Sequence, residues 1–179
     1  MSCTLFPDEY LSSTYEIDFR RFREEGIRGI IFDIDNTLVP HGAPADDRAR
    51  ALFEELRTLG FQVVLLSNNK EPRVKMFRDG LVDASHVQYL YKAGKPGRAG
   101  YERAMELMGT DTASTLFVGD QIFTDVWGAR RAGIYSVLVK KIHPKEEIQI
   151  VLKRALEFFV LLAYRIHNKG GHHEDCHRK

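Results

Sequence analysis

Short apolar runs alternate with amphipathic stretches along most of this chain. The apolar runs lie at 29–32, 61–66, 87–94 and 116–119, and helical patterns lie at 45–59, 71–78, 97–108 and 125–131. Strands that alternate with helices in this way are typical of a parallel sheet wound on both faces. The pattern therefore predicts an α/β fold, a doubly wound, Rossmann-like three-layer sandwich.

Two acidic residues follow the first run directly, in the segment Asp-Ile-Asp-Asn-Thr-Leu that begins at Asp33. A carboxylate is a weak nucleophile, so it needs a cation to neutralise charge and a second acid for the leaving-group proton, and Asp33 and Asp35 can supply the two carboxyls. The same residues also suit a plain strand-ending turn. A calcium loop does not fit, because Ala43 and Pro44 occupy the stretch where its late acidic ligand belongs.

Further polar residues follow each of the later runs. The Ser67 hydroxyl and the backbone N–H groups beside it can hold a phosphate, or Ser67 can cap a helix. Lys95 can offset the charge of a phosphoryl group, or it can be a solvated turn residue. Asp120 and Asp125 can complete a magnesium site, and Asp125 can also cap the next helix. Because ligands of such sheets bind beyond the carboxyl ends of the strands, we expect these groups to converge there.

Four motifs in this order resemble those of the haloacid dehalogenase (HAD) superfamily of phosphatases. Within it the chain is similar to the IIIA subgroup of YqeG type, which includes enzymes that act on phosphatidylglycerophosphate. The words that carry this resemblance are Phe-Asp-Ile-Asp-Asn-Thr-Leu-Val from Phe32, Ser-Asn-Asn from Ser67, Tyr-Lys-Ala-Gly-Lys-Pro from Tyr91 and Gly-Asp-Gln-Ile-Phe-Thr-Asp-Val from Gly119. The resemblance spans nearly all of the chain from 5 to about 140.

The resemblance implies the catalytic residues. Asp33 is expected to be the nucleophile and Asp35 the general acid and base. Ser67 is expected to bind the phosphate, and Lys95 to be the lysine of the third motif. The candidate substrate-binding residues are Thr37, Ser67, Asn68 and Lys95.

The resemblance also implies a Mg²⁺ cofactor. Its ligands are expected to be Asp33, the backbone carbonyl of Asp35, and Asp120. Asp125 joins this metal set indirectly, either through a water molecule or by orienting Lys95.

A cap domain has no room in this sequence, because the stretches 39–61 and 70–95 hold little more than a helix and a connection each. Many related phosphatases close such an insertion over small substrates. An open site instead admits a phosphate carried on something large or on a surface. Small phosphates and a neighbouring subunit that serves as the cover are the alternatives, so a homo-oligomer stays open.

The C-terminal part is organised differently. The segment 146–168 predicts an extra amphipathic helix after a capless phosphatase domain at 1–145, and 169–179 predicts a flexible polar tail rich in histidine, with metal binding as the less favoured reading. The apolar run 158–164 is far shorter than the roughly 20 residues of a membrane-spanning helix. The helix either packs on the domain or a second copy, or makes a peripheral membrane contact through 146–166.

Composition excludes several classes of protein. The 179 residues carry a formal net charge of +1 with dispersed basic residues, which does not indicate a nucleic-acid partner. The two cysteines, Cys3 and Cys176, lie near opposite ends and are expected to be free thiols in a reducing compartment. The start of the chain lacks the pattern of a secretory signal. These features predict the cytoplasm, with the inner face of a membrane as an additional peripheral position.

The sequence thus predicts a magnesium-dependent phosphomonoester hydrolase with an aspartyl-phosphate intermediate. The resemblance favours dephosphorylation of phosphatidylglycerophosphate to phosphatidylglycerol. The alternative is a phosphatase for a soluble sugar phosphate, a nucleotide or a phosphoprotein. A catalytically idle binding protein is disfavoured, because every position that the chemistry needs is filled.

Overall fold

The computed structural model describes residues 5–143, which form alternating strands and helices. The chain divides into two compact units, Met1–Ile142 and His143–Lys179, and the description covers most of the first. The strands are β1 (Glu9–Leu11), β2 (Gly29–Phe32), β3 (Gln62–Leu66), β4 (Val87–Leu90), β5 (Thr115–Gly119) and β6 (Tyr135–Val139). The helices are α1 (Phe19–Glu24), α2 (Asp47–Thr58), α3 (Glu71–Asp79), α4 (Arg98–Met108) and α5 (Trp127–Ala132), with short turns η1 (Thr14–Glu16), η2 (Ala84–His86) and η3 (Ile122–Val126).

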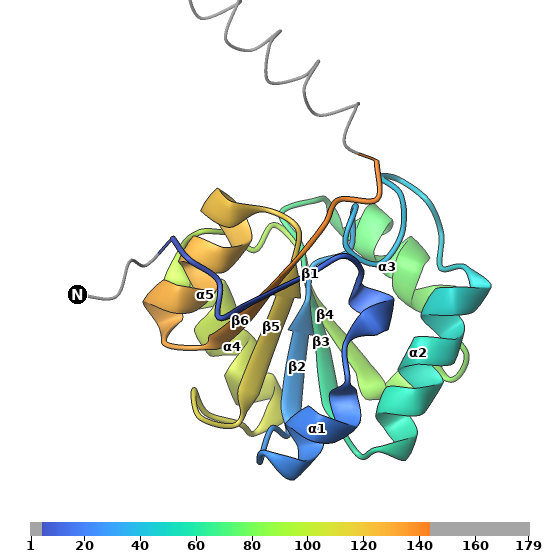
Figure 1. The fold of residues 1–179 in the computed structure, drawn as a ribbon. Helices are drawn as coiled ribbons and strands as arrows, with labels where there is room; N and C mark the ends of the chain where they lie inside the picture. The colour runs from blue at the N-terminus through green and yellow to red at the C-terminus, as the bar shows by residue number, and fades with distance from the viewer. Residues whose placement is uncertain (1–4, 144–179) are drawn as a thin grey trace, which may run out of the picture. The chain divides into compact units, whose positions relative to one another are not determined.

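All six strands form one sheet in the order β1-β6-β5-β2-β3-β4, and every neighbouring pair is parallel (Figure 1). From β2 the chain adds β3 and β4 on one side, and it then returns to add β5 and β6 on the other. This reversal makes a topological switch point between β2 and β5, where such sheets bind their ligands. The predicted doubly wound α/β class is confirmed.

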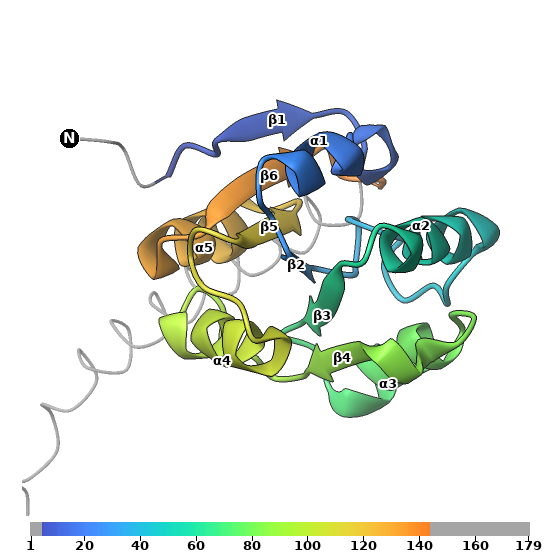
Figure 2. The same cartoon turned by 90° about the horizontal axis from the view of Figure 1, so that it is seen from below.

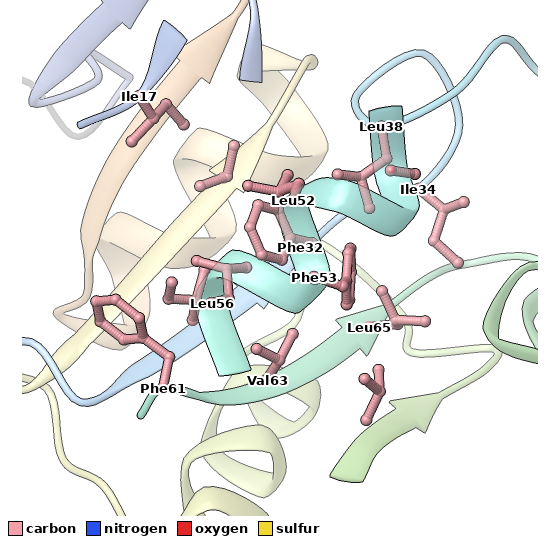
Figure 3. Packing of buried hydrophobic residues seen from close by; sticks show 14 of the residues in the cluster. Ile17, Phe32, Ile34, Leu38, Leu52, Phe53, Leu56, Phe61, Val63 and Leu65 are labelled. Atoms are coloured by element: carbon pink, nitrogen blue, oxygen red, sulfur yellow. The ribbon is translucent and has the colours of Figure 1, made fainter. Parts of the chain in front are cut away.

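Helices cover both faces of the sheet, as the end-on view shows (Figure 2). Side chains alternate along each strand, so Ile30 and Phe32 join the apolar cluster under α1, α2 and α3, whereas Ile31 joins the cluster under α4 and α5. Leu56 of α2 packs in the first cluster with Phe32 and Val63 (Figure 3). An apolar cluster therefore packs on each face of the sheet, and the loops after the strands lie at its carboxyl edge.

The predicted elements and the observed ones differ at two places near the functional motifs. The apolar run at 87–94 forms strand only over Val87–Leu90, so Lys95 lies in a loop rather than at a strand end. The helical pattern at 125–131 begins as the π-helical turn η3, and α5 follows it. Periodicity cannot separate a strand from the extended loop after it, nor a π turn from an α turn.

The described residues hold no cap domain. Between β2 and β3 the only helix is α2, and between β3 and Lys95 the chain forms α3, η2 and β4. No helix within 5–143 is long and apolar enough to cross a membrane. The predicted C-terminal helix at 146–168, the tail at 169–179, and both cysteines lie outside the described residues.

Candidate active site

The predicted chemical residues converge at the carboxyl edge of the sheet. Asp33, Ser67 and Asp120 each directly follow a strand, and β5, β2 and β3 are neighbours in the sheet. All three side chains are buried, as is Lys95, which the loop after β4 brings to the same place. A buried polar set of this kind is costly unless its members pair with one another.

Lys95 makes the central contact of the site. Its Nζ atom donates to Asp33 Oδ1 at 2.6 Å and to Asp125 Oδ1 at 2.7 Å. Burial on its own would lower the pKa of Lys95, but the charges of Asp125 and Asp33 outweigh this and raise it above the ordinary value. Lys95 is therefore a permanent cation between two acids that follow different strands, Asp33 after β2 and Asp125 on η3 after β5.

Three carboxylates cluster here, and Lys95 pairs with two of them. Ligand oxygens of Asp33, Asp120 and Asp125 all lie within 4.8 Å of one another. Burial, reinforced by the charge of Asp125, raises the pKa of Asp33 to about 6, against the opposing effect of Lys95. Burial together with the charge of Asp33 raises the pKa of Asp120 to about 7. The cluster holds more acid than its own lysine can neutralise.

The donor set fits a hard divalent cation. Asp120 Oδ2 is buried without a hydrogen-bond partner in the described residues, and its nearest cation, Lys141 Nζ, is 3.7 Å away. The Thr37 hydroxyl lies 3.2 Å from Asp120 Oδ1 and 3.4 Å from Asp33 Oδ2. Buried carboxylate oxygens at this spacing are the ligands that magnesium and similar ions prefer.

Asp125 has a hydrogen-bond donor for each of its carboxylate oxygens. One of its oxygens accepts from Lys95, and the other accepts from the Gln121 backbone N–H at 3.1 Å. Gly119 makes this approach possible, because a Cβ at that position would lie 2.7 Å from Asp125 Oδ2. With both oxygens engaged, Asp125 is placed to orient Lys95.

Tyr101 of α4 fixes the turn that carries Asp125, and sequence reasoning missed it. Its hydroxyl donates to the backbone oxygen of Thr124 at 2.8 Å and lies 3.2 Å from that of Asp125. A side chain at Gly128 would collide with the Tyr101 ring. A tyrosine on an amphipathic helix normally packs in the core, so the sequence contained no separate signal for this role.

Asp35 lies in a different environment, surrounded by hydrogen-bond donors. Its Oδ1 atom accepts from Arg73 Nη2 at 2.8 Å, Arg73 Nε at 3.1 Å and the Gly42 backbone N–H at 2.7 Å. Its Oδ2 atom accepts from Asn69 Nδ2 at 2.7 Å. His41 Nδ1 lies 3.6 Å from Oδ1. Sequence reasoning missed Arg73, whose only signal was its place in the first turn of the helix after Ser67.

Asn68 uses its side chain on the loop that carries Lys95. Its Oδ1 atom accepts from the Lys95 backbone N–H at 2.8 Å, and its Nδ2 atom donates to the Lys95 carbonyl at 3.0 Å. This pair of bonds ties the loop after β4 to the end of β3. The predicted contacts of Thr37 and Asn68 with substrate stay predictions.

A separate hollow lies at the other edge of the sheet. It has a volume of about 490 Å³ and is lined by residues that precede strands, among them Ile27, Thr112 and Ile134. The described acidic cluster is not part of its lining. The clustered acids and Lys95 therefore lie at the carboxyl edge and not around this hollow.

Comparison with known proteins gives a consistent result. Residues 92–149 match a family described as HAD-hydrolase-like. The chain is 34% identical over 160 residues to the probable phosphatase YqeG of Bacillus subtilis, covering 89% of this chain and 91% of that protein. It is 28% identical over 151 residues to the chloroplastic phosphatidylglycerophosphate phosphatase 1 of Chlamydomonas reinhardtii, covering 80% of this chain and 56% of that protein.

Solved structures share the fold at low sequence identity. An uncharacterized protein from Listeria monocytogenes superposes with a TM-score of 0.54 at 18% identity, over 67% of this chain and 84% of that one. NagD from Escherichia coli K-12 superposes with a TM-score of 0.54 at 14% identity, over 68% of this chain and 91% of that one. These likenesses extend to the architecture and not to the substrate.

Proposed function

Because the chain belongs to the YqeG-type branch of the HAD superfamily and is a phosphatase, we propose that it removes the phosphate of phosphatidylglycerophosphate. The observation that carries the chemistry is Lys95, buried between Asp33 and Asp125 beside Asp120. Two plant and algal relatives are named phosphatidylglycerophosphate phosphatases, which supports the lipid substrate. The absence of a cap from the described residues also supports a substrate presented on a surface.

The first step transfers the phosphoryl group to Asp33. A carboxylate oxygen of Asp33 attacks phosphorus, and the bond between phosphorus and the ester oxygen breaks in line with it. Lys95 and the Ser67 hydroxyl stabilise the charge on the phosphoryl oxygens. Asp35 gives its proton to the leaving glycerol oxygen, which yields phosphatidylglycerol and an aspartyl-phosphate.

The second step releases phosphate and restores the enzyme. Asp35, now a carboxylate, takes a proton from water as the water attacks phosphorus, and the bond from phosphorus to the Asp33 oxygen breaks. Both oxygens of Asp35 rest on the donors of Arg73, Gly42 and Asn69. Arg73 therefore positions Asp35, the residue that works in both steps. One oxygen of Asp35 must release its donor before it can carry a transferable proton.

Magnesium is the proposed cofactor. Asp33, Asp120 and the backbone carbonyl of Asp35 would hold it, and Asp125 would act through Lys95. When bound, the ion supplies positive charge against the phosphoryl oxygens and the nucleophile. Its oxygen-only donor set favours magnesium over softer metals. We place the protein in the cytoplasm, working peripherally at a membrane, with 146–166 as one proposed contact.

The test is phosphate release from phosphatidylglycerophosphate in mixed detergent micelles, set beside soluble sugar phosphates, nucleotides and a phosphopeptide. We expect a preference for the lipid of about a hundredfold or more in kcat/KM, and loss of activity with a chelator that Mg²⁺ restores. The Asp33→Asn variant is the background control. A flat profile, or a preference for a soluble ester, would retain the phosphatase chemistry and overturn the lipid assignment.

A further inference from the structure

The edge that holds the acidic cluster also presents apolar side chains to solvent. Ile122 and Phe123 lie on the turn η3 between Asp120 and Asp125. They are 43% and 69% exposed, although Asp125 on the same turn is 1% exposed. The turn thus buries its acid beside the strand end and leaves its two apolar residues uncovered. The proposed catalysis does not require an exposed phenylalanine beside the acidic cluster, and exposed apolar side chains that gather in a patch are typical of an interaction surface.

Exposed apolar residues occur on both sides of the nucleophile. Tyr91 is 44% exposed directly after β4, and Ile142 is 38% exposed shortly after β6, so they follow strands on opposite sides of β2. The Ile142 backbone N–H donates to the Asn36 carbonyl at 3.2 Å, which joins its segment to the loop after Asp33. Four of the nine exposed large hydrophobic side chains in the described residues therefore follow strands at this one edge.

Lysines accompany these apolar residues. Lys70, Lys92 and Lys140 follow β3, β4 and β6, and all three are exposed. Within residues 5–143 none of them forms an ion pair. Lys141, by contrast, lies 3.7 Å from Asp120 Oδ2. Three exposed lysines around an apolar patch, with no ion pair to any residue of 5–143, favour an anionic partner.

We propose that this edge docks on an anionic lipid surface, which presents the phosphate directly to Asp33. The inference rests on the lipid substrate proposed above, and it locates the contact at the mouth of the site. Aromatic and aliphatic side chains enter the interfacial layer while lysines meet the head-group phosphates. The docking rim is defined as Tyr91, Ile122, Phe123 and Ile142 with Lys70, Lys92 and Lys140.

A second copy of the chain is the competing occupant of an apolar rim. Two rims face to face would bring the lysines of one copy towards those of the other, and like charges that meet across an interface are unfavourable. Lipid phosphates carry the opposite charge and are also the surface on which the proposed substrate lies. Charge complementarity therefore favours the membrane.

The experiment is flotation of the full-length protein with vesicles of phosphatidylcholine, alone or mixed with phosphatidylserine, which is anionic but is not the proposed product. The variant Ile122→Ser/Phe123→Ser should bind the mixed vesicles about tenfold or more weakly than wild type. Val82→Ser is the matched control, because Val82 is 62% exposed and lies near the amino end of β4. It should bind as wild type does.

Charge is tested in the same assay. The triple variant Lys70→Gln/Lys92→Gln/Lys140→Gln should lose most of the preference for mixed vesicles and most of its salt dependence. Lys75→Gln, a change at an exposed lysine of α3, should keep both. Hydrolysis of para-nitrophenyl phosphate should be unchanged in the apolar double variant, which shows that the site is intact.

The outcomes separate the rim from the substrate. Vesicle binding that is equal in wild type and the double variant overturns the docking rim, even if phosphatidylglycerophosphate in micelles is hydrolysed. Weaker vesicle binding by the double variant, with no hydrolysis of that lipid by wild type, supports the rim and overturns the substrate. The third outcome is a wild type that sediments as a dimer and a double variant that sediments as a monomer, with unchanged vesicle binding. That result assigns the rim to a second copy of the chain and overturns the proposal.

Discussion

Two regions at the same edge of the sheet, a cluster of three buried acids and the single acid Asp35, have opposite electrostatic surroundings. Asp33, Asp120 and Asp125 cluster together; Lys95 pairs with Asp33 and Asp125, and Lys141 Nζ lies 3.7 Å from Asp120. Asp35, two residues from Asp33, accepts from Arg73, Asn69 and the Gly42 backbone. The first group has too much negative charge for its own donors, and the second has donors on both oxygens. The difference teaches that one region is arranged to receive a cation and the other to position a single acid.

The largest effect should come from removing Asp33, the proposed nucleophile, in the first region. Asp33→Asn should lower phosphatase turnover by about 10⁴-fold or more, because an amide cannot form the phosphoryl-enzyme bond. The amide has nearly the same shape and Asp125 stays paired with Lys95, so the fold should persist. Phosphate release and thermal unfolding measured together test this. Near-normal turnover would disprove the nucleophile assignment.

Changing Arg73 removes two of the hydrogen bonds to Asp35 in the second region. Arg73→Ala should lower kcat by roughly tenfold to a hundredfold with a smaller change in KM, because Asp35 loses the donors that orient it for proton transfer. Arg73→Lys should restore part of the loss. Arg78→Ala is the matched control, since Arg78 lies on the same helix and pairs with Asp79. A rise in KM alone, with kcat unchanged, would mean that Arg73 binds substrate instead.

A change at Gly128 tests whether Tyr101 holds the turn η3, which carries Asp125 of the first region. Gly128→Ala should lower the free energy of unfolding by about 1–3 kcal/mol, because its Cβ collides with the Tyr101 ring that holds η3. Chemical denaturation measures the loss. Combining it with Tyr101→Leu should recover part of the stability, since the collision disappears. Full stability in Gly128→Ala alone would show that Tyr101 does not constrain this turn.

The smallest effect is a pH dependence of stability between about pH 4 and pH 7, which the first region should produce. The pKa of Asp120 is raised to about 7, so in the absence of metal its contribution to stability is complete below its unfolded pKa near 4 and is lost as pH rises toward 7. In a chelator, Asp120→Asn should therefore gain stability relative to wild type between about pH 4 and pH 7. Mg²⁺ should reverse the order at pH 8, because it binds the ionised form.

The matched comparison for this effect is Asp111→Asn. Asp111 is exposed, and hydrogen bonds from Ser114 lower its pKa, so its difference from wild type should change little above pH 5 and should not respond to Mg²⁺. Denaturant midpoints across pH measure both variants. The same pH dependence in both would remove the link to the acidic cluster.

Local sequence was sufficient for the order of the fold and for the residues of the first region. The strand-like runs at 29–32 and 116–119 each run into an acid, and the structure has Asp33 and Asp120 directly after β2 and β5. Prediction succeeded here because a parallel sheet gathers its strand ends at one edge. The resemblance to a known family then implied roles that periodicity alone cannot assign.

The environment of Asp35 was beyond the reach of the sequence. Arg73 and Asn69 follow the next strand, and their contact with Asp35 depends on the path of the loop between β2 and α2. Loop paths follow from packing and not from periodicity. For the same reason the sequence did not reveal that Lys95 lies beyond its strand in a loop held by Asn68.

The sequence by itself determined the alternation of elements, the parallel sheet, and the acids and lysine that the proposed chemistry needs, because each depends on residue type and short-range spacing. Only the tertiary structure decided how charge is shared. It paired Lys95 with two of three clustered acids, gave Asp35 donors on both oxygens, and left Phe123 uncovered at the same edge. Burial and the distance between charges set these properties, and both arise only when strands far apart in the chain become neighbours.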